Sequence, residues 1–197
     1  MMYNLYKTMP ISFDLEDLRV KHNCVNYFET GLYDPRTNVS SKLALSCNFD
    51  KVYCIEIRKD WVELGNMVFK DYIATGKYNL YLDDSTNMKN YVMNDNLKNK
   101  TMFFLDAHVD SEKINNYKKK CPLFDELEAI KNIERNDNVI LIDDLRVIKK
   151  SFPWGEKSYG DIDFLQQIKD TIFTINENYK FDTLNGCIPD DVLLAYI

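Results

Sequence analysis

Short apolar runs alternate with longer segments of helical spacing along most of the chain. Five runs have the length and composition of β-strands: residues 24–28, 52–57, 78–82, 101–105 and 139–142. Apolar side chains spaced three or four positions apart predict helices at residues 39–47, 61–75, 88–97 and 123–133. Because parallel neighbours need a crossover connection, this alternation predicts βαβ units and a parallel sheet. The fourth and fifth runs are almost continuously apolar, which is typical of central strands covered by helices on both faces.

The end of the chain follows a different pattern. A helical stretch at residues 162–175 precedes two strand-like runs, 179–184 and 191–197, which are separated by the turn Asn185-Gly186. Since no helix lies between these two runs, they should form an antiparallel hairpin. The whole pattern therefore predicts five parallel strands closed by an antiparallel hairpin, which differs from a dinucleotide-binding fold with six parallel strands. No internal repeat and no linker rich in Pro, Gly or Ser is present, so we expect one domain.

Composition and charge narrow the classes of function. The chain has 197 residues, 45% hydrophobic and 28% charged, as in a folded protein. Its 25 Lys+Arg against 31 Asp+Glu give a net charge of −6, which argues against a nucleic-acid binder that relies on a basic face. No apolar stretch approaches the ~20 residues that span a bilayer. The five cysteines form no CxxC pair and indicate a reducing compartment, with Cys24, Cys47 and Cys54 buried as thiols.

Acidic residues stand at the end of every predicted parallel strand. They are Glu29, Glu56, Asp83 with Asp84, Asp106, and Asp143 with Asp144. Ligands of open α/β sheets bind beyond the carboxyl ends of the strands, and like charges that converge there repel each other. The pattern therefore indicates a site for cations and hydroxyl groups. Gly31 allows a tight turn after the first strand, whereas the absence of GxGxxG and GxxxxGK[ST] argues against NAD, FAD and P-loop nucleotides.

These acids belong to a series of short motifs. The motifs are FETG at 28–31, VYCIE at 52–56, DS at 84–85, FLDAH at 104–108, CPLFDEL at 121–127, ILIDD at 140–144 and PDDVLLAY at 189–196. The series resembles class I S-adenosylmethionine-dependent methyltransferases, most closely the small sugar O-methyltransferases of bacteria and of large DNA viruses of algae. With the strand pattern, we expect a Rossmann-like α/β fold, a seven-stranded sheet in the order 3-2-1-4-5-7-6 with strand 7 antiparallel, and helices on both faces. Residues 1–197 would form one methyltransferase domain, with 1–22 as an extension and 23–197 as the core.

The resemblance implies where S-adenosylmethionine binds. The cofactor would contact Glu29, Thr30, Gly31, Glu56, Asp84, Ser85 and Asp106. Within this set, Glu29 would accept a hydrogen bond from the ammonium group of the methionine part, and Glu56 would accept both ribose hydroxyls. Asp84 and Ser85 would meet the adenine amino group.

The resemblance also implies a divalent cation held by Asp106, Asp143 and Asp144. Hard oxygen ligands suit Mg²⁺ or Mn²⁺, and the sequence has no Cys or His cluster of the kind that binds zinc. A cation bound by carboxylates can bind two adjacent hydroxyls, lower their pKa and fix their orientation. His108, two residues after Asp106, is the candidate catalytic base, since the ordinary pKa of histidine lies near neutrality. The alternative is a loop histidine bonded to the backbone.

We therefore expect a divalent-cation-assisted O-methyltransferase that methylates a sugar hydroxyl, such as that of a deoxyhexose like rhamnose in a glycan. The polar loop at residues 109–120 favours a carbohydrate over an aromatic diol. A catechol-type methyltransferase and a non-catalytic methyltransferase-like docking module are the alternatives. We expect a cytoplasmic protein, in the host cytoplasm if the chain is viral, that belongs to a larger glycan-synthesising polypeptide or acts alone.

Two further features have simple interpretations beside functional ones. Asp125, Glu126 and Glu128 lie at the start of a predicted helix, where acids are favoured by the helix dipole and need no function. Trp154 is either a face on which a sugar stacks or part of a lid that packs against the core.

Overall fold

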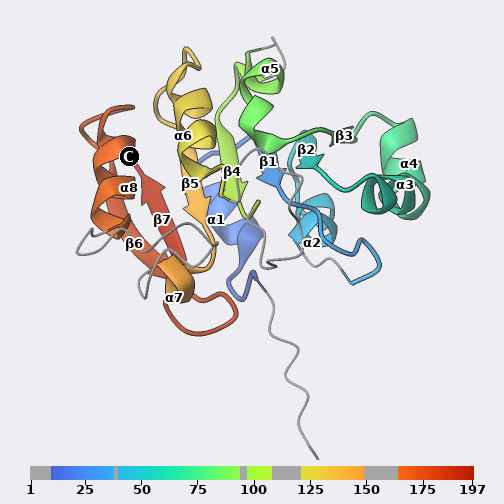
Figure 1. Ribbon diagram of the computed structural model, residues 1–197, viewed down its shortest axis with the longest axis horizontal. Coiled ribbons are helices and arrows are strands. Elements are labelled where there is room, and N and C mark those ends of the chain that lie inside the picture. Colours follow the sequence, from blue (N-terminus) through green and yellow to red (C-terminus); the bar gives the residue numbers. More distant parts are fainter. Residues whose placement is uncertain (1–9, 38–39, 94–96, 108–120, 149–163) are drawn as a thin grey trace, which may run out of the picture.

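The computed structural model describes residues 10–37, 40–93, 97–107, 121–148 and 164–197. Seven strands form one mixed sheet in the order β3-β2-β1-β4-β5-β7-β6 (Figure 1). The strands are β1 (Asn26–Thr30), β2 (Lys51–Glu56), β3 (Tyr78–Leu82), β4 (Thr101–Leu105), β5 (Val139–Ile142), β6 (Lys180–Leu184) and β7 (Val192–Tyr196). Strands β1 to β5 are parallel, and β7 runs antiparallel to both β5 and β6. The predicted order and the antiparallel hairpin are confirmed.

The central strands are apolar on both faces, so the sheet separates two cores. Along β4, Phe103 and Leu105 face one core, whereas Met102 and Phe104 face the other. Successive side chains of a strand point to opposite faces, and both sets are buried in β4. This double burial explains why the sequence of β4 is a continuous apolar run instead of an alternating one.

Helices cover both faces, as predicted (Figure 1). The core on one face includes side chains of α5 (Lys89–Val92), α6 (Leu123–Lys131), α7 (Leu145–Ile148) and α8 (Phe164–Phe173). The core on the other face includes side chains of α1 (Leu15–Lys21) and α2 (Ser40–Ser46). The helices α3 (Lys59–Val68) and α4 (Lys70–Ala74) follow β2, and the 3₁₀ helix η1 (Ser85–Asn87) follows β3. Within the described part of the chain, no helix has the length and apolar character needed to cross a membrane.

Several elements differ from their predicted form. Among the described residues of the helix predicted at 88–97, only Lys89–Val92 are α-helical. The helix predicted at 61–75 is divided into α3 and α4 at Phe69, whose side chain is buried among residues of the α1–α2 core. The first strand ends at Thr30 and not at 28, so Glu29 lies inside it. The short helix α7 follows β5 directly and has no counterpart in the predicted pattern. All five cysteines are free, and Cys24, Cys47 and Cys54 are buried as predicted.

Candidate functional site

The carboxyl ends of β1 to β5 meet at one edge of the sheet. Thr30 of β1 pairs with Leu105 of β4, and Leu105 pairs with Ile142 of β5. On the other side, Glu56 at the end of β2 pairs with Leu82 of β3. Every acid predicted from the sequence lies within two residues of one of these strand ends. The register therefore gathers these acids along a single edge, which is where open α/β sheets bind their ligands.

The turn after β1 is built around Gly31. Its φ is +87°, a conformation that side chains rarely adopt, and an added Cβ would lie 2.7 Å from the carbonyl oxygen of Asp106. The Gly31 N–H donates to the carbonyl oxygen of Ile55 at 2.9 Å. The turn thus brings the backbone after β1 against the backbone after β4, at the point where the strand order reverses.

The Glu56 carboxylate fixes the residues that follow this turn. One oxygen accepts the backbone N–H groups of Leu32, at 2.7 Å, and Tyr33, at 3.2 Å. The other oxygen accepts the backbone N–H of Arg58 at 2.7 Å. Burial raises the pKa of Glu56, and these backbone hydrogen bonds lower it. A carboxylate has about four lone-pair positions, so three donors leave Glu56 room for a further hydroxyl donor.

Glu29 lies at the base of the site, in contact with α2. Its carboxyl group is fully buried and accepts hydrogen bonds from the hydroxyl groups of Ser41 and, at 3.3 Å, Tyr27. The Ser41 hydroxyl is also 2.9 Å from that of Tyr78. Burial raises the pKa of Glu29 to about 7, while hydrogen bonding to Ser41 opposes this shift. In this arrangement Glu29 joins β1 to α2 through a buried polar network.

The turn after β3 presents the two predicted adenine contacts. The Asp84 carboxylate accepts the backbone N–H of Thr86 at 2.9 Å and so caps η1. Ser85, the first residue of η1, is buried. The preceding Asp83 accepts a hydrogen bond from the Tyr91 hydroxyl at 2.7 Å. These contacts fix the turn, which lies at the same edge of the sheet as Glu56.

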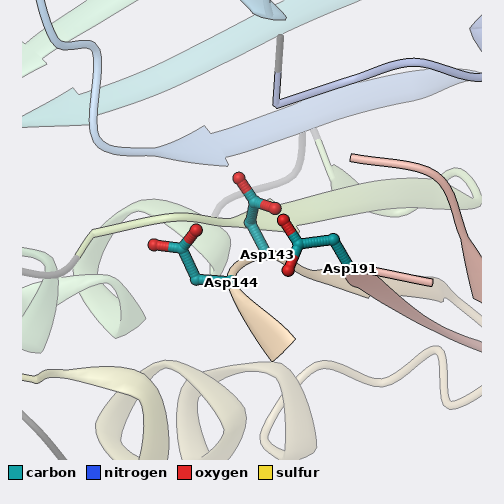
Figure 2. A group of neighbouring side chains, drawn as sticks. All are labelled: Asp143, Asp144 and Asp191. Carbon is teal, nitrogen blue, oxygen red and sulfur yellow. The ribbon is translucent and has the colours of Figure 1, made fainter. Parts of the chain in front are cut away.

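Three carboxylates gather beside the carboxyl end of β5 (Figure 2). Asp143 and Asp144 follow β5, and Asp191 immediately precedes β7; a carboxylate oxygen from each lies within 4.8 Å of the others. All three residues are buried. Asp143 and Asp144 were predicted from the sequence as cation ligands, whereas Asp191 was not. Because β7 is antiparallel, the start of this strand, and not its end, reaches the site edge, so an inspection of strand ends alone misses Asp191.

Arg146 of α7 places a positive charge within this acidic group. Its guanidinium lies 2.5 Å from the Asp144 carboxylate and also bonds to that of Asp191. The backbone N–H of Arg146 donates to the Asp191 carboxylate at 3.0 Å, and the N–H of Leu145 donates to the Asp191 carbonyl oxygen at 2.8 Å. The charge of two of the three carboxylates is therefore partly balanced by a side chain of the same chain.

Asp106 lies within electrostatic reach of the same acids. Burial, followed by the negative charges of Asp143 and Asp144, raises the pKa of Asp106 well above its usual range. Its backbone N–H donates to the carbonyl oxygen of Thr30 at 3.2 Å, which joins β4 to the turn after β1. Of the three predicted cation ligands, Asp143 and Asp144 belong to the close acidic group, together with Asp191, whereas Asp106 does not belong to it.

Glu126 is a further acid of this region, and its sequence position predicts only a residue at the start of a helix. It is 1% exposed, and burial raises its pKa to about 8, while hydrogen bonding with the hydroxyls of Ser85 and Thr30 opposes this shift. Its spacing from Leu123 and Ile130, three and four residues, places it on the buried face of α6. This periodicity is the signal that could have identified it. A pocket beside Glu126 is lined by Leu105, Ala107, Cys121, Leu123, Glu126, Ile142, Asp143 and Ile148.

Three predicted features lie outside the described residues: the candidate base His108, the loop at 109–120 and Trp154. The described part of the candidate site therefore consists of the strand ends, the turns after β1 and β3, and the acids near β5. The roles of His108 and Trp154 stay predictions.

No protein-family model and no curated protein matches this chain. Solved structures of methyltransferases share its fold. An O-methyltransferase from Bacillus cereus in complex with S-adenosylhomocysteine has a TM-score of 0.58 and 12% identity, over 92% of this chain and 78% of that one. TomG, an O-methyltransferase from Streptomyces achromogenes in complex with S-adenosylmethionine, gives 0.57 and 12%, over 92% and 77%. The S-adenosylhomocysteine-bound methyltransferase PaMTH1 of Podospora anserina gives 0.55 and 12%, over 91% and 74%. The fold is therefore the Rossmann-like fold of these enzymes.

Proposed function

We propose that this protein transfers a methyl group from S-adenosylmethionine to a hydroxyl group. The observation that carries the proposal is the sheet order 3-2-1-4-5-7-6 with acids at the carboxyl end of β2 and just beyond the ends of β3, β4 and β5. A sheet of this kind binds its ligand beyond that edge. The solved structures of the same fold that hold S-adenosylmethionine or S-adenosylhomocysteine support the choice of cofactor.

The cofactor would lie across the turns after β1, β2 and β3. In this proposal Glu56 accepts from one ribose hydroxyl with its remaining lone-pair position, and Asp84 and Ser85 face the adenine amino group. The methionine part lies over Thr30 and Gly31, beside Asp106. Glu29 supports this turn from the α2 side, because Ser41 and Tyr27 already donate to its carboxyl group.

Methyl transfer needs orientation of the acceptor and removal of its proton. The methyl carbon passes from the sulfonium sulfur to the hydroxyl oxygen, the carbon–sulfur bond breaks, and the hydroxyl proton leaves. The sulfonium is already activated, so the main tasks of the protein are to align the acceptor and to raise its alkoxide character. His108 is the residue that we propose as base, and Asp106 assists at the end of β4.

The acids at β5 fit a hard divalent cation such as Mg²⁺ or Mn²⁺. Their donor atoms are all carboxylate oxygens, and those of Asp143, Asp144 and Asp191 lie within 4.8 Å of one another. We propose Asp106, Asp143 and Asp144 as the ligands. A bound cation would lower the pKa of the acceptor hydroxyl. Arg146 balances part of the charge on the side of Asp191.

We propose a carbohydrate as acceptor, with a deoxyhexose such as rhamnose as the first to test. The polar residues at 109–120 support this choice. A small aromatic diol is the second candidate, because the pocket beside Glu126 is lined mainly by apolar side chains, among them Leu105, Leu123 and Ile142. We further propose a cytoplasmic location, with the chain acting within or alongside the glycan-synthesising machinery and not on nucleic acid.

Two measurements test this function. Calorimetry should detect binding of S-adenosylmethionine, and its absence would leave the docking-module alternative. Methyl transfer should then be assayed on a panel of deoxyhexosides and catechols, each with Mg²⁺, with Mn²⁺ and with EDTA. Transfer to a deoxyhexoside that EDTA abolishes supports the full proposal. Transfer that occurs only to catechols selects the second acceptor class.

A further inference from the structure

A carboxyl oxygen of Glu126 is buried without a hydrogen-bond donor from the described residues. The side chain comes from α6 and is 1% exposed, and the atom is its Oε1. Buried polar atoms ordinarily have a partner, and an apolar residue of similar size would need none. Exposed Glu128, on the same helix, shows that the helix start by itself does not require burial of an acid. The Oε1 atom therefore calls for a donor that the described residues do not supply.

The pocket that Glu126 lines is otherwise mainly apolar. Its walls include Leu105 at the end of β4, Ile142 at the end of β5 and Leu123 of α6. None of its described lining residues is basic, and the two that carry a carboxyl group are Glu126 and Asp143. The pocket thus offers a ligand apolar walls and a hydrogen-bond acceptor at Glu126, next to an acid that we propose as a cation ligand.

We propose that Glu126 determines acceptor specificity: its Oε1 accepts a hydrogen bond from a hydroxyl of the acceptor that does not bind the cation. The inference rests on the proposed function, because it concerns the acceptor of that methyl transfer. In the proposed function the cation binds two adjacent hydroxyls beside Asp143, so Glu126 takes a third. A deoxyhexoside has this third hydroxyl, and its C–H and methyl groups suit the apolar walls of the pocket. Catechol has no third hydroxyl to offer.

A neutral hydroxyl is the donor that matches Glu126. Burial raises the pKa of Glu126 to about 8, so at pH 7 the carboxyl group is mainly protonated and carries little charge to attract an ammonium group. A protonated carboxyl group keeps acceptor capacity. A site built to bond a substrate hydroxyl discriminates against the analogue that lacks it, because the buried polar atom of the protein is then left without its partner.

The test combines variants of Glu126 with acceptors that lack one hydroxyl. E126M keeps the length of the side chain but removes its acceptor oxygens, and E126Q keeps an acceptor oxygen. E128Q changes an exposed glutamate of the same helix and is the matched control. The acceptors are methyl rhamnoside and its singly deoxygenated analogues. For each protein, kcat/KM is measured for every acceptor with Mg²⁺ present, affinity for S-adenosylmethionine by calorimetry, and folding by the thermal unfolding midpoint.

We expect removal of one non-reacting hydroxyl to lower kcat/KM of the wild type roughly 10- to 100-fold and to change that of E126M less than about threefold. Removal of a hydroxyl that binds the cation should lower kcat/KM equally in both proteins. E126Q and E128Q should keep the wild-type ratio between acceptors, and every variant should keep its affinity for S-adenosylmethionine.

The same ratios between acceptors in the wild type and in E126M would overturn the inference, since a purely structural loss lowers transfer to all acceptors alike. If E126M does not fold, E126A is measured in its place against the same criterion. If only catechols are methylated, pyrogallol and catechol form the pair of acceptors. Absence of cofactor binding, or of transfer to any acceptor, in the wild type itself would instead overturn the proposed function.

Discussion

At the scale of single residues, the carboxylates at the carboxyl edge of the sheet have different structural roles, because they accept hydrogen bonds from different donors. Glu56 is engaged by three backbone N–H groups, two from the residues after Gly31 and one from Arg58. Glu29 is engaged by hydroxyls of Tyr27 and Ser41 in the interior. Glu56 therefore fixes the conformation of the loop after Gly31, and Glu29 holds α2 against the sheet.

Replacing Glu56 should therefore damage both the loop and the proposed cofactor site. In Glu56→Ala, three N–H groups lose a charged acceptor, and such bonds contribute roughly 1.5–3 kcal/mol each. Glu56→Gln should also be impaired, because an amide has one acceptor oxygen and places an NH₂ group against a backbone donor. We expect affinity for S-adenosylmethionine to fall at least tenfold in both variants, by calorimetry, and amide exchange of Leu32 and Tyr33 to accelerate. Unchanged affinity in Glu56→Ala would remove Glu56 from the site.

The raised pKa of Glu29 predicts how stability depends on pH. The value of about 7 lies above the ordinary 4.5, so between these pH values the folded state binds more protons than the unfolded state. The stabilising contribution is therefore complete below pH 4.5 and is lost as pH rises through about 7. Relative to Glu29→Gln, the wild type should lose stability on the order of 3 kcal/mol between pH 5 and pH 8.

Urea unfolding of both proteins at half-unit steps of pH measures this difference, in which the other titrating groups cancel. Glu177→Gln, at an exposed glutamate far from β1 in the sequence, serves as the control and should follow the wild type. A constant difference between the wild type and Glu29→Gln across this range would show that Glu29 does not titrate there.

At the scale of elements, the turn between β1 and α2 is fixed by a close approach of two backbones. In Gly31→Ala the new Cβ would lie 2.7 Å from the Asp106 carbonyl oxygen, in addition to the strain of a positive φ. Gly76→Ala is the matched comparison, since Gly76 also has a positive φ of +68° but its Cβ would meet only the flexible end of Lys51, at 3.4 Å. Left-handed strain alone costs about 1–2 kcal/mol.

We therefore expect Gly76→Ala to lose about that amount in the free energy of unfolding and to keep its affinity for S-adenosylmethionine. Gly31→Ala should lose more stability, because β1 and β4 must separate, and should bind the cofactor at least tenfold more weakly. Denaturant unfolding and calorimetry on the pair provide the test. Equal losses of stability and equal cofactor affinity in the two variants would mean that the turn after β1 can accommodate the added Cβ without displacing β4.

The accuracy of the sequence-based predictions also depends on the element. The bounds of β3, β4 and β5 agree with the structure because each is an apolar run bounded by polar residues. The bounds of β1 do not agree, because its last two residues are polar and yet buried. The pattern of hydrophobic positions cannot show that the buried Glu29 carboxyl group accepts hydrogen bonds from the hydroxyls of Ser41 and Tyr27.

The sequence also predicted some of the acids of the candidate site and missed others. Acids at the ends of parallel strands could be identified from the sequence, since parallel strands place their carboxyl ends at one edge. Asp191 could not be found in this way, because it precedes an antiparallel strand. Glu126 could have been found, since its spacing from Leu123 places it on the apolar face of α6, but its position at the helix start offered a simpler interpretation.

At the scale of the whole molecule, the insertion of β7 between β5 and β6 brings distant parts of the chain together at the acids. Asp143 and Asp144 are separated from Asp191 by more than forty residues in sequence, yet their carboxylates converge (Figure 2). Close carboxylates repel each other unless a positive charge is present. Arg146 supplies one such charge, and the proposed cation would supply the rest.

A cation that binds the folded state alone should therefore stabilise the entire protein. At a free concentration of one hundred times its dissociation constant, the gain is about 2.7 kcal/mol, and in a chain of this size each kcal/mol raises the unfolding midpoint by roughly 2–4 °C. We expect Mg²⁺ or Mn²⁺ to raise the midpoint of the wild type by about 5–10 °C over EDTA. Asp143→Asn should lose this rise and the methyl transfer while keeping its affinity for S-adenosylmethionine, because the cation serves the acceptor. Asp182→Asn, at an exposed acid of β6, should behave as the wild type. If neither ion shifts the midpoint and activity survives EDTA, the transfer proceeds without a metal, and proton removal falls to the side chains alone.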